Sequence, residues 1–271
     1  MKTRILVAAV GLPLLLAVLL LLPPWGTAVL FAAICAVGAH ELTVCVAPER
    51  KCVQIPAMIW AGLVPLGTYF LGWPDLPVWA LFTLLAAVTV IALAIYEKEE
   101  ASLLPGAAAA VFAGAVIPTL LSYMVLLRSM DAGRALVLLP FVCVFTSDSG
   151  GYFVGMFLGK RHPLPKLSPK KTVAGFVGSF LCGTLCVCLY FFILSRTGHT
   201  VRWGGAVLCG VLGNLFCQTG DLAFSLIKRC FGIKDYGRLL PGHGGVLDRF
   251  DSLVFAAPVI YFVVTRLGVL S

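Results

Sequence analysis

Charged residues are scarce in this chain. Asp, Glu, Lys and Arg make up 12% of its 271 residues, whereas a typical soluble domain carries about 25%. Hydrophobic residues account for 60%, and the mean hydropathy is +1.01. This composition excludes an ordinary water-soluble protein and indicates an integral membrane protein.

Two further patterns are lacking. The apolar runs are continuous and do not alternate with polar residues, which excludes a membrane β-barrel. The ten cysteines show no spacing with histidine that is typical of a zinc site. Cys182, Cys186 and Cys188 are most simply interpreted as small packing residues of one helix. We therefore expect neither a structural zinc site nor disulfides.

Long apolar runs fill most of the chain. A helix that crosses a membrane needs roughly 20 apolar residues, and about nine runs approach this length. They are 5–22, 25–41, 54–72, 76–96, 102–127, 134–158, 172–195, 203–227 and 252–270. The first run resembles a signal peptide but is long for that role, so we interpret it as a helix. The sequence predicts an all-α polytopic membrane protein, a single domain over 1–271.

The basic residues indicate the orientation. With nine spans and the N-terminus inside, most of the 20 Lys and Arg residues fall on the N-terminal side, which predicts that this side is cytoplasmic. The net charge of +8 suits anionic membrane lipid and an anionic soluble substrate. Nucleic acid is not an expected partner, because the basic residues are divided among short loops.

Polar chemistry is concentrated in the second half of the chain. The spans within 1–133 are less polar, and 134–271 is the predicted catalytic half. His40 and Glu41 are an exception at the end of the second run. A solvated helix end is the favoured interpretation of this pair, and a supporting contact to the site is the alternative.

The run 203–227 and the residue after it carry a polar stripe. Its members are spaced 4, 3, 4 and 3 residues apart, which places them on one helical face: Asn214, Gln218, Asp221, Ser225 and Lys228. Such a stripe must face protein or a water-filled cavity. Asn214 and Gln218 fit a hydrogen-bonded seam between helices, whereas a carboxylate such as Asp221 indicates a functional role.

A second polar segment begins in the run 134–158. Asp148 lies in "TSDSGGYFVG", where two glycines permit either close helix contact or a local break. In the loop that follows, Ser168 looks like a helix start, with Lys170, Lys171 and Thr172 in the first turn. Cations there oppose the helix dipole unless an anion binds. A simple positive-inside anchor explains the spacing equally well.

The stretch 220–252 gathers acids, cations and glycines. Asp248 and Asp251 are three residues apart at the mouth of the last run, and with Asp221 they would form an all-oxygen site that suits Mg²⁺. Asp251 alone is explained equally well as an N-cap. The nearby basic residues can balance a polyphosphate, and the glycines let backbone N–H groups approach it. The residues therefore predict a membrane enzyme that handles a phosphorylated nucleotide or polyphosphate with Mg²⁺.

The run from Ser225 to Asp251 resembles the signature of the phosphatidate cytidylyltransferase (CDP-diacylglycerol synthase) family. The matching residues are Ser225, Lys228, Arg229, Lys234, Asp235, Pro241, His243, Gly244, Gly245, Asp248, Arg249 and Asp251. The resemblance extends to "SDSGGYFVG" and "SPKKT". Two positions depart from many bacterial members: Phe224 stands where they carry an acid, and Ala174 where they carry an acid or amide.

The resemblance implies a reaction and a site. CTP and phosphatidic acid would give CDP-diacylglycerol and pyrophosphate at the cytoplasmic face of a bacterial inner membrane. The protein would be an all-helical homodimer with a polar cavity that faces the cytoplasm. Mg²⁺ would be required, with a second cation also implicated. Asp221 and Asp248 would be metal ligands, with Asp251 close by, and Asp148 would complete the metal shell or orient a lysine. The expected catalytic residues are Asp221, Asp248, Lys228 and Arg249, and the expected substrate-binding residues are Ser168, Lys170, Lys171, Thr172, Ser225, Arg229, Lys234, His243, Gly244 and Gly245.

Two other functions stay open. A CTP-dependent lipid kinase of the polyprenol type would also bind CTP but would transfer the γ-phosphoryl group. An anion transporter would use the polar residues to line a route through the membrane. The position of the polar residues toward one face of the membrane favours the transferase over the transporter.

Overall fold

The computed structural model describes residues 2–96, 103–242 and 244–270, which form helices, turns and two isolated β-bridges. The chain divides into two compact units. Unit 1 comprises 1–129 and 231–250, and unit 2 comprises 130–230 and 251–271. The change from less polar to polar sequence at 133/134 thus falls close to a unit boundary, but the segment 231–250 belongs with the N-terminal helices.

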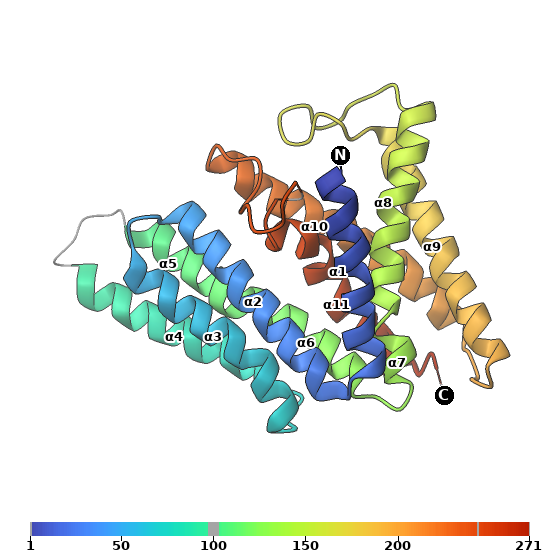
Figure 1. The fold of residues 1–271 in the computed structure, drawn as a ribbon, viewed down its shortest axis with the longest axis horizontal. Helices are drawn as coiled ribbons and strands as arrows, with labels where there is room; N and C mark the ends of the chain where they lie inside the picture. The colour runs from blue at the N-terminus through green and yellow to red at the C-terminus, as the bar shows by residue number, and fades with distance from the viewer. Residues whose placement is uncertain (1, 97–102, 243, 271) are drawn as a thin grey trace. The chain divides into compact units, whose positions relative to one another are not determined.

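Unit 1 is built on a group of packed helices (Figure 1). They are α1 (Lys2–Leu21), α2 (Pro24–Val46), α3 (Lys51–Phe70), α4 (Leu76–Tyr96), α5 (Leu103–Val111), the π-helical turn η1 (Phe112–Val116) and α6 (Ile117–Arg128). Helix α2 packs along α3, and both contact α6. The π turn comes just before Pro118, which has no backbone N–H to donate. A single π-helical turn of this kind accommodates the missing hydrogen bond within an otherwise α-helical stretch.

The end of α1 is held by a buried arginine. Arg128, at the end of α6, is 6% exposed. Its Nε donates to the Leu19 carbonyl at 2.8 Å and its Nη2 to the Leu22 carbonyl at 2.9 Å. The last carbonyls of a helix have no partner within the helix, so Arg128 satisfies the C-terminus of α1 and fixes it to α6.

Unit 2 contains the rest of the chain. Its helices are α7 (Gly133–Leu136), α8 (Leu139–Leu158), α9 (Val173–Arg196), α10 (Trp203–Cys230) and most of α11 (Leu247–Leu267). Glycines bring α8 and α9 together: a Cβ added to Gly150 would lie 2.5 Å from Cys182 Cβ, and one added to Gly178 would lie 2.4 Å from Val154 Cβ. Helix α8 continues through Gly150 and Gly151, so these glycines permit close helix contact and not a break.

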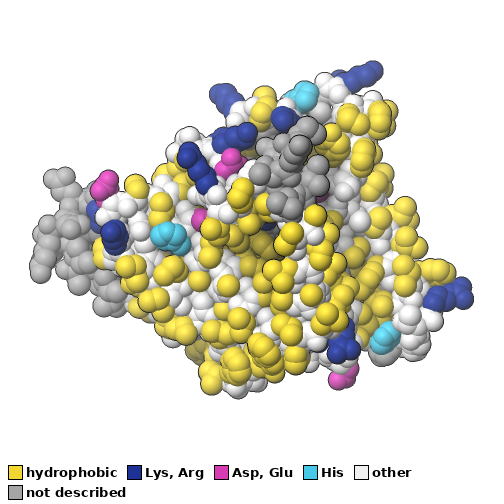
Figure 2. Space-filling model, viewed as in Figure 1, with side chains coloured by type: hydrophobic (Ala, Val, Ile, Leu, Met, Phe, Trp, Pro, Cys, Tyr) yellow, Lys and Arg dark blue, Asp and Glu magenta, His cyan; other side chains and the backbone are white. Residues whose placement is uncertain are grey.

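The prediction of an all-α polytopic membrane protein is confirmed. Within the described residues, seven helical stretches are long and apolar enough to cross a membrane: Pro24–Val46, Lys51–Phe70, Pro105–Arg128, Gly133–Leu158, Val173–Arg196, Trp203–Cys230 and Leu247–Leu267. The other two predicted runs coincide with α1 and α4, in which the residues with described side chains include the apolar stretches Ala9–Leu21 and Leu76–Thr89. Figure 2 shows hydrophobic side chains over much of the visible face, with most of the Lys and Arg side chains toward its margins.

Candidate active site

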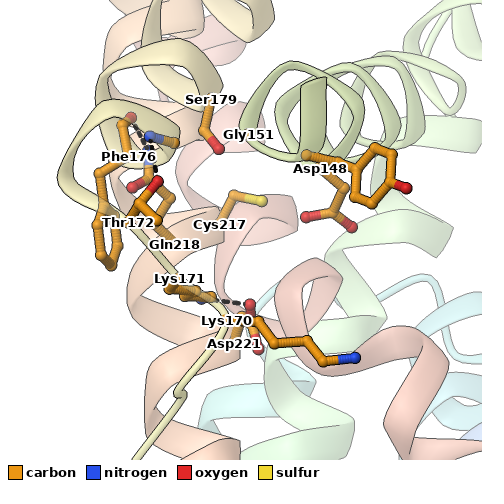
Figure 3. Close-up of a pocket in the computed structure, with 12 residues that line it drawn as sticks. Asp148, Gly151, Lys170, Lys171, Thr172, Phe176, Ser179, Cys217, Gln218 and Asp221 are labelled. Carbon is orange, nitrogen blue, oxygen red and sulfur yellow. Dashed lines mark hydrogen bonds and ion pairs between the residues drawn. The ribbon is translucent and has the colours of Figure 1, made fainter. Parts of the chain in front are cut away.

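A polar cavity of about 200 Å³ opens in unit 2, among α8, α9, α10 and the loop before α9 (Figure 3). Its walls combine cations with carboxylates. The lining residues are Asp148, Gly151, Tyr152, Lys170, Lys171, Thr172, Gly175, Phe176, Ser179, Cys217, Gln218 and Asp221. The structure thus brings five predicted site residues to one cavity: Asp148, Lys170, Lys171, Thr172 and Asp221.

Thr172 caps the helix that follows the two lysines. Its hydroxyl accepts a hydrogen bond from the Gly175 N–H at 3.0 Å, which makes it the N-cap of α9. A threonine cap satisfies one of the free N–H groups of the first turn. The prediction of a helix start at Ser168, with the lysines in the first turn, is therefore wrong. Lys170 and Lys171 lie in the turn that precedes α9, and Ser168 accepts the Lys171 N–H through its backbone carbonyl at 3.1 Å.

An ion pair crosses the cavity. Lys171 Nζ contacts Asp221 Oδ2 (Figure 3), and the Ser225 hydroxyl donates to Asp221 Oδ1 at 3.3 Å. The Lys171 ammonium also lies 5.5 Å from the centre of the Phe176 ring, a distance typical of a cation–π contact. The side chains of Lys171 and Asp221 are 26% and 29% exposed, so water and small anions can reach the pair.

The polar stripe of α10 faces protein and the cavity, as predicted. Asn214 is fully buried, with its Nδ2 donating to the Gly210 carbonyl at 2.7 Å. It lies against Gly183 of α9, where a Cβ would collide with the amide. Gln218 and Asp221 line the cavity, and Lys228 is buried. The stripe therefore begins in the packing between α9 and α10 and continues into the cavity wall.

Other signature residues of unit 2 have structural contacts. Arg229 is exposed, and its Nε donates to the Leu167 carbonyl at 3.3 Å, which ties the end of α10 to the loop before α9. Asp251 lies inside α11, which begins at Leu247, so the N-cap interpretation of Asp251 is wrong. Phe224 is fully buried with its ring edge-on to Phe255. Phe224 therefore fills the packing between α10 and α11, and it is not part of the cavity wall.

In unit 1, the segment 231–250 is organised by Asp248. This residue is 7% exposed, and its Oδ2 accepts the N–H groups of Tyr236 at 2.8 Å and Gly245 at 2.9 Å. Gly242 and Gly244 have φ of +79° and +89°, a backbone region that favours glycine. The basic side chains of this segment are exposed: Lys234, Arg238 and Arg249. His243 lies outside the described residues.

Glu41 of α2 also holds this segment. It is 7% exposed. Its Oε1 accepts the Val246 N–H at 3.0 Å, and its Oε2 accepts the Leu247 N–H at 2.9 Å. The favoured interpretation of Glu41 as part of a solvated helix end is therefore wrong, because the carboxylate is buried against the segment that carries signature residues. The alternative, a supporting contact to the site, stays a prediction. The carboxylate is buried because the unpaired N–H groups at the start of α11 require an acceptor.

Sequence reasoning missed four lining side chains of the cavity in unit 2: Tyr152, Phe176, Ser179 and Cys217, which is four residues before Asp221. Helical spacing could have found them. Tyr152 is four residues after Asp148, whereas Phe176 and Ser179 follow Thr172 by four and seven residues. Residues at these intervals share a helical face, so each should line any cavity that Asp148 and Thr172 line.

The cavity of unit 2 contains two carboxylates, whereas the sequence predicted a cluster of three. Among the described residues, no group of three or more His, Cys, Asp or Glu side chains is arranged to hold a metal ion. Asp148 and Asp221 are the two acids of the cavity in unit 2. Protein-bound Mg²⁺ is typically held by one or two carboxylates, with waters and substrate phosphates as its other ligands. The donor set of the cavity therefore fits Mg²⁺ bound together with a phosphate substrate.

These features define an all-helical membrane protein with cations and carboxylates around one polar cavity. The comparison with known families is more specific. The model of the cytidylyltransferase family matches residues 2–267. The chain belongs to this family, which confirms the resemblance seen in the signature residues.

Several curated relatives are named phosphatidate cytidylyltransferase. The chain is 44% identical over 161 residues to the protein of Mycobacterium leprae, which covers 59% of the chain and 50% of the relative. It is 38% identical over 141 residues to the Bacillus subtilis protein, which covers 52% and 51%. The Staphylococcus aureus protein is 36% identical over 141 residues, 52% of the chain and 53% of that protein. The chain thus spans about half the length of the curated relatives it matches.

Proposed function

We propose that the chain transfers the cytidylyl group of CTP to phosphatidic acid, with CDP-diacylglycerol and pyrophosphate as products. The name of its relatives and its membership of the cytidylyltransferase family support this activity. The observation that carries the proposal is the cavity of unit 2, where Lys170 and Lys171 lie with Asp148 and Asp221. Cations suit the phosphates of both substrates, and the carboxylates suit the metal that accompanies a nucleotide triphosphate.

The lysines before α9 are assigned to the phosphatidate. Lys170 and Lys171 stand where the membrane-spanning part of α9 begins, a position that corresponds to the lipid headgroup plane. Phosphatidate presents a phosphate monoester at that level. Its arrival would compete with Asp221 for the Lys171 ammonium, which releases the carboxylate toward a cation. Lys228, Arg229 and Lys234 are assigned to the phosphates of CTP.

Asp221, with Asp148 in the same cavity, is assigned to Mg²⁺. Asp248 and Asp251 remain predicted ligands on the strength of the signature. When bound, Mg²⁺ would neutralise phosphate charge and stabilise the departing pyrophosphate. Asp148 carries a second role in this scheme, because it can orient Lys170 or Lys171 when no metal is bound.

The chemistry requires positioning more than covalent help. A phosphatidate oxygen attacks the α-phosphorus of CTP in line, and pyrophosphate leaves. Phosphoryl-type transfer is catalysed mainly by alignment and charge neutralisation. The phosphatidate oxygen is already ionised at neutral pH, so no residue is required as a strong base. Lys171 and Arg249 are assigned to neutralising charge, and the apolar walls of Tyr152 and Phe176 would limit access of water.

The proposed setting is the inner membrane of a bacterial cell, with the cavity open to the cytoplasm. The relatives are bacterial proteins, and the basic loop before α9 is expected on the cytoplasmic side by the positive-inside rule. A homodimer in the membrane is part of the same proposal.

The experiment that tests this function is an assay of purified protein with labelled CTP and phosphatidate, with and without Mg²⁺. We expect CDP-diacylglycerol and pyrophosphate, formed only when Mg²⁺ is present. A lipid kinase would instead give CDP and a phosphorylated lipid. Flux of label into sealed vesicles without conversion would indicate a transporter, and either result would overturn the proposal.

A further inference from the structure

Glu41 differs from the acids of the cavity because it is committed to backbone groups of another segment. It lies in α2 and is 7% exposed. Both of its oxygens accept N–H groups at the start of α11, from Val246 at 3.0 Å and Leu247 at 2.9 Å. A buried carboxylate is costly unless it is hydrogen-bonded, and a negative charge is favourable at a helix N-terminus. Glu41 and the start of α11 therefore require each other.

The first turn of α11 lies along α2 beside this contact. Leu247 Cδ1 lies 3.4 Å from the position of a Cβ on Gly38. The ring of Phe250 meets the ring of Phe31 edge-on, with 6.4 Å between centroids. The contact between α2 and the start of α11 thus consists of apolar packing, except for the hydrogen bonds of Glu41. These hydrogen bonds fix which turn of α2 lies against the start of α11.

Two glycines enclose the Glu41 carboxylate. A Cβ on Gly237 would lie 2.3 Å from Glu41 Oε1, and a Cβ on Gly245 would lie 2.5 Å from Glu41 Oε2. Neither glycine has a positive φ, so backbone conformation does not require glycine at either position. The space taken by Glu41 explains both. The backbone at Gly237 and at Gly245 therefore packs directly against the Glu41 carboxylate, which we call the template role of Glu41.

We propose that Glu41 is a positioning residue that presets the described part of the segment 231–250, which carries the exposed Lys234, to bind the phosphates of CTP, an inference that rests on the proposed function. Asp248 contributes from inside the segment, through the N–H groups of Tyr236 and Gly245. Together the two acids hold four backbone N–H groups: those of Tyr236, Gly245, Val246 and Leu247. Glu41 does not touch substrate in this scheme, and it acts by removing conformational freedom that CTP binding would otherwise have to restrict.

The first test is Glu41→Gln. The amide keeps the size of the side chain but turns one acceptor into an N–H donor that faces a backbone N–H. Hydrogen exchange of the peptide 244–250, followed by mass spectrometry, is expected to accelerate about tenfold or more, since hydrogen bonds to charged groups contribute on that scale. The KM for CTP is expected to rise about tenfold, on the same scale, while the KM for phosphatidate stays close to that of the native protein.

Gln54→Leu is the matched control. Gln54 is another buried polar side chain of unit 1, and its Nε2 donates to the carbonyls of Ala47 at 2.8 Å and Pro48 at 3.0 Å. Its loss should lower thermal stability without changing exchange of 244–250 or the KM for CTP. If Gln54→Leu reproduces the KM and exchange changes of Glu41→Gln, general destabilisation explains both and the positioning role is wrong.

A double-mutant cycle tests the contact itself. Gly237→Ala alone should mimic Glu41→Gln, because the new methyl group displaces the carboxylate. In a Glu41→Ala background the methyl group has room, so Gly237→Ala should add little to the exchange rate. Additive effects of the two substitutions would show that Gly237 and Glu41 act independently, which contradicts the template role.

The exchange measurement separates this inference from the proposed activity. If the native protein makes no CDP-diacylglycerol but Glu41→Gln accelerates exchange of 244–250, the proposed function fails while the ordering role of Glu41 survives. If the native protein is active and Glu41→Gln leaves both exchange and the KM for CTP unchanged, the positioning role is wrong and the proposed function stands.

Discussion

The acids of the two units are used differently. In unit 1, Glu41 and Asp248 accept hydrogen bonds from the backbone of the segment 231–250. In unit 2, Asp148 and Asp221 line a cavity, and Asp221 pairs with a lysine that solvent can reach. An acid that holds backbone N–H groups is part of the scaffold, whereas one that meets an exchangeable cation can respond to a ligand.

This difference separates two roles that one sequence signature combines. The signature contains Asp248 and ends at Asp251, with Asp221 just before its first residue. The structure gives Asp248 an ordering role through Tyr236 and Gly245, and places Asp221 on the cavity wall. Variants of the two acids should therefore differ in what accompanies their loss of activity.

Asp221→Asn should have the largest effect. The amide cannot balance Lys171 or hold Mg²⁺ as a carboxylate does, and loss of an important electrostatic group typically lowers the rate about a hundred- to a thousandfold. CDP-diacylglycerol formation by the purified variant measures this, with thermal unfolding as the control for folding. Near-normal activity would remove Asp221 from the metal site.

Asp248→Asn should lose at least about a hundredfold in rate as well. It should also loosen the segment 231–250. The carboxylate oxygen that accepts the N–H groups of Tyr236 and Gly245 becomes part of an amide, which is a weaker acceptor and carries no charge. Hydrogen exchange of 236–245 should therefore rise in Asp248→Asn and stay native in Asp221→Asn. Equal exchange rates in the two variants would show that Asp248 does not order the backbone more than Asp221 does.

The sequence predicted the helices and the stripe of α10 well, for physical reasons. Long apolar runs have few alternatives to membrane helices, and polar residues spaced by three and four within such a run must share a face. Gln218 and Asp221 share a face as this spacing predicted, and both line the cavity, although Gln218 was expected in a seam between helices. Close contact of α8 and α9 was one of two outcomes that Gly150 and Gly151 allowed.

Contacts that depend on long-range packing could not be predicted in the same way. Glu41 looked like a solvated helix end, because its partners Val246 and Leu247 lie about two hundred residues away and offer only backbone N–H groups. The start of α9 was misplaced because both Ser168 and Thr172 are good N-caps. Only the structure shows which hydroxyl accepts a first-turn N–H, and it is that of Thr172.

Lys171→Met tests whether the positive charge that pairs with Asp221 also binds phosphatidate. The thioether fills similar space but cannot attract a phosphate, so the KM for phosphatidate should rise about tenfold, the scale of one charge-assisted hydrogen bond. Lys171→Arg is the matched control and should retain most of the affinity because it keeps the charge. Kinetics in mixed micelles at fixed CTP measure the change, and an unchanged KM would reassign the phosphatidate site.

Gly150→Ala should destabilise unit 2 without touching either group of acids. Its Cβ would lie 2.5 Å from Cys182 Cβ and 2.9 Å from the Gly178 carbonyl oxygen, and overpacking of this kind costs about 1–3 kcal/mol. Gly204→Ala in α10 is the control, because a Cβ there meets nothing within 4 Å. In the same detergent, the unfolding temperature of Gly150→Ala should be well below that of Gly204→Ala.

Thr172→Ala should have the smallest effect on stability. Its effect on phosphatidate binding tests whether the N-cap of α9 helps to place Lys170 and Lys171 in the cavity. Loss of an N-cap costs about 1 kcal/mol, which thermal unfolding should detect as a small decrease. Lys170 and Lys171 immediately precede the cap, so a freed turn should also weaken phosphatidate binding a few-fold. Thr172→Ser keeps the hydroxyl and should restore both properties. If Thr172→Ala lowers stability but leaves the KM for phosphatidate native, the lysines do not depend on the cap, and their placement comes instead from the ion pair with Asp221.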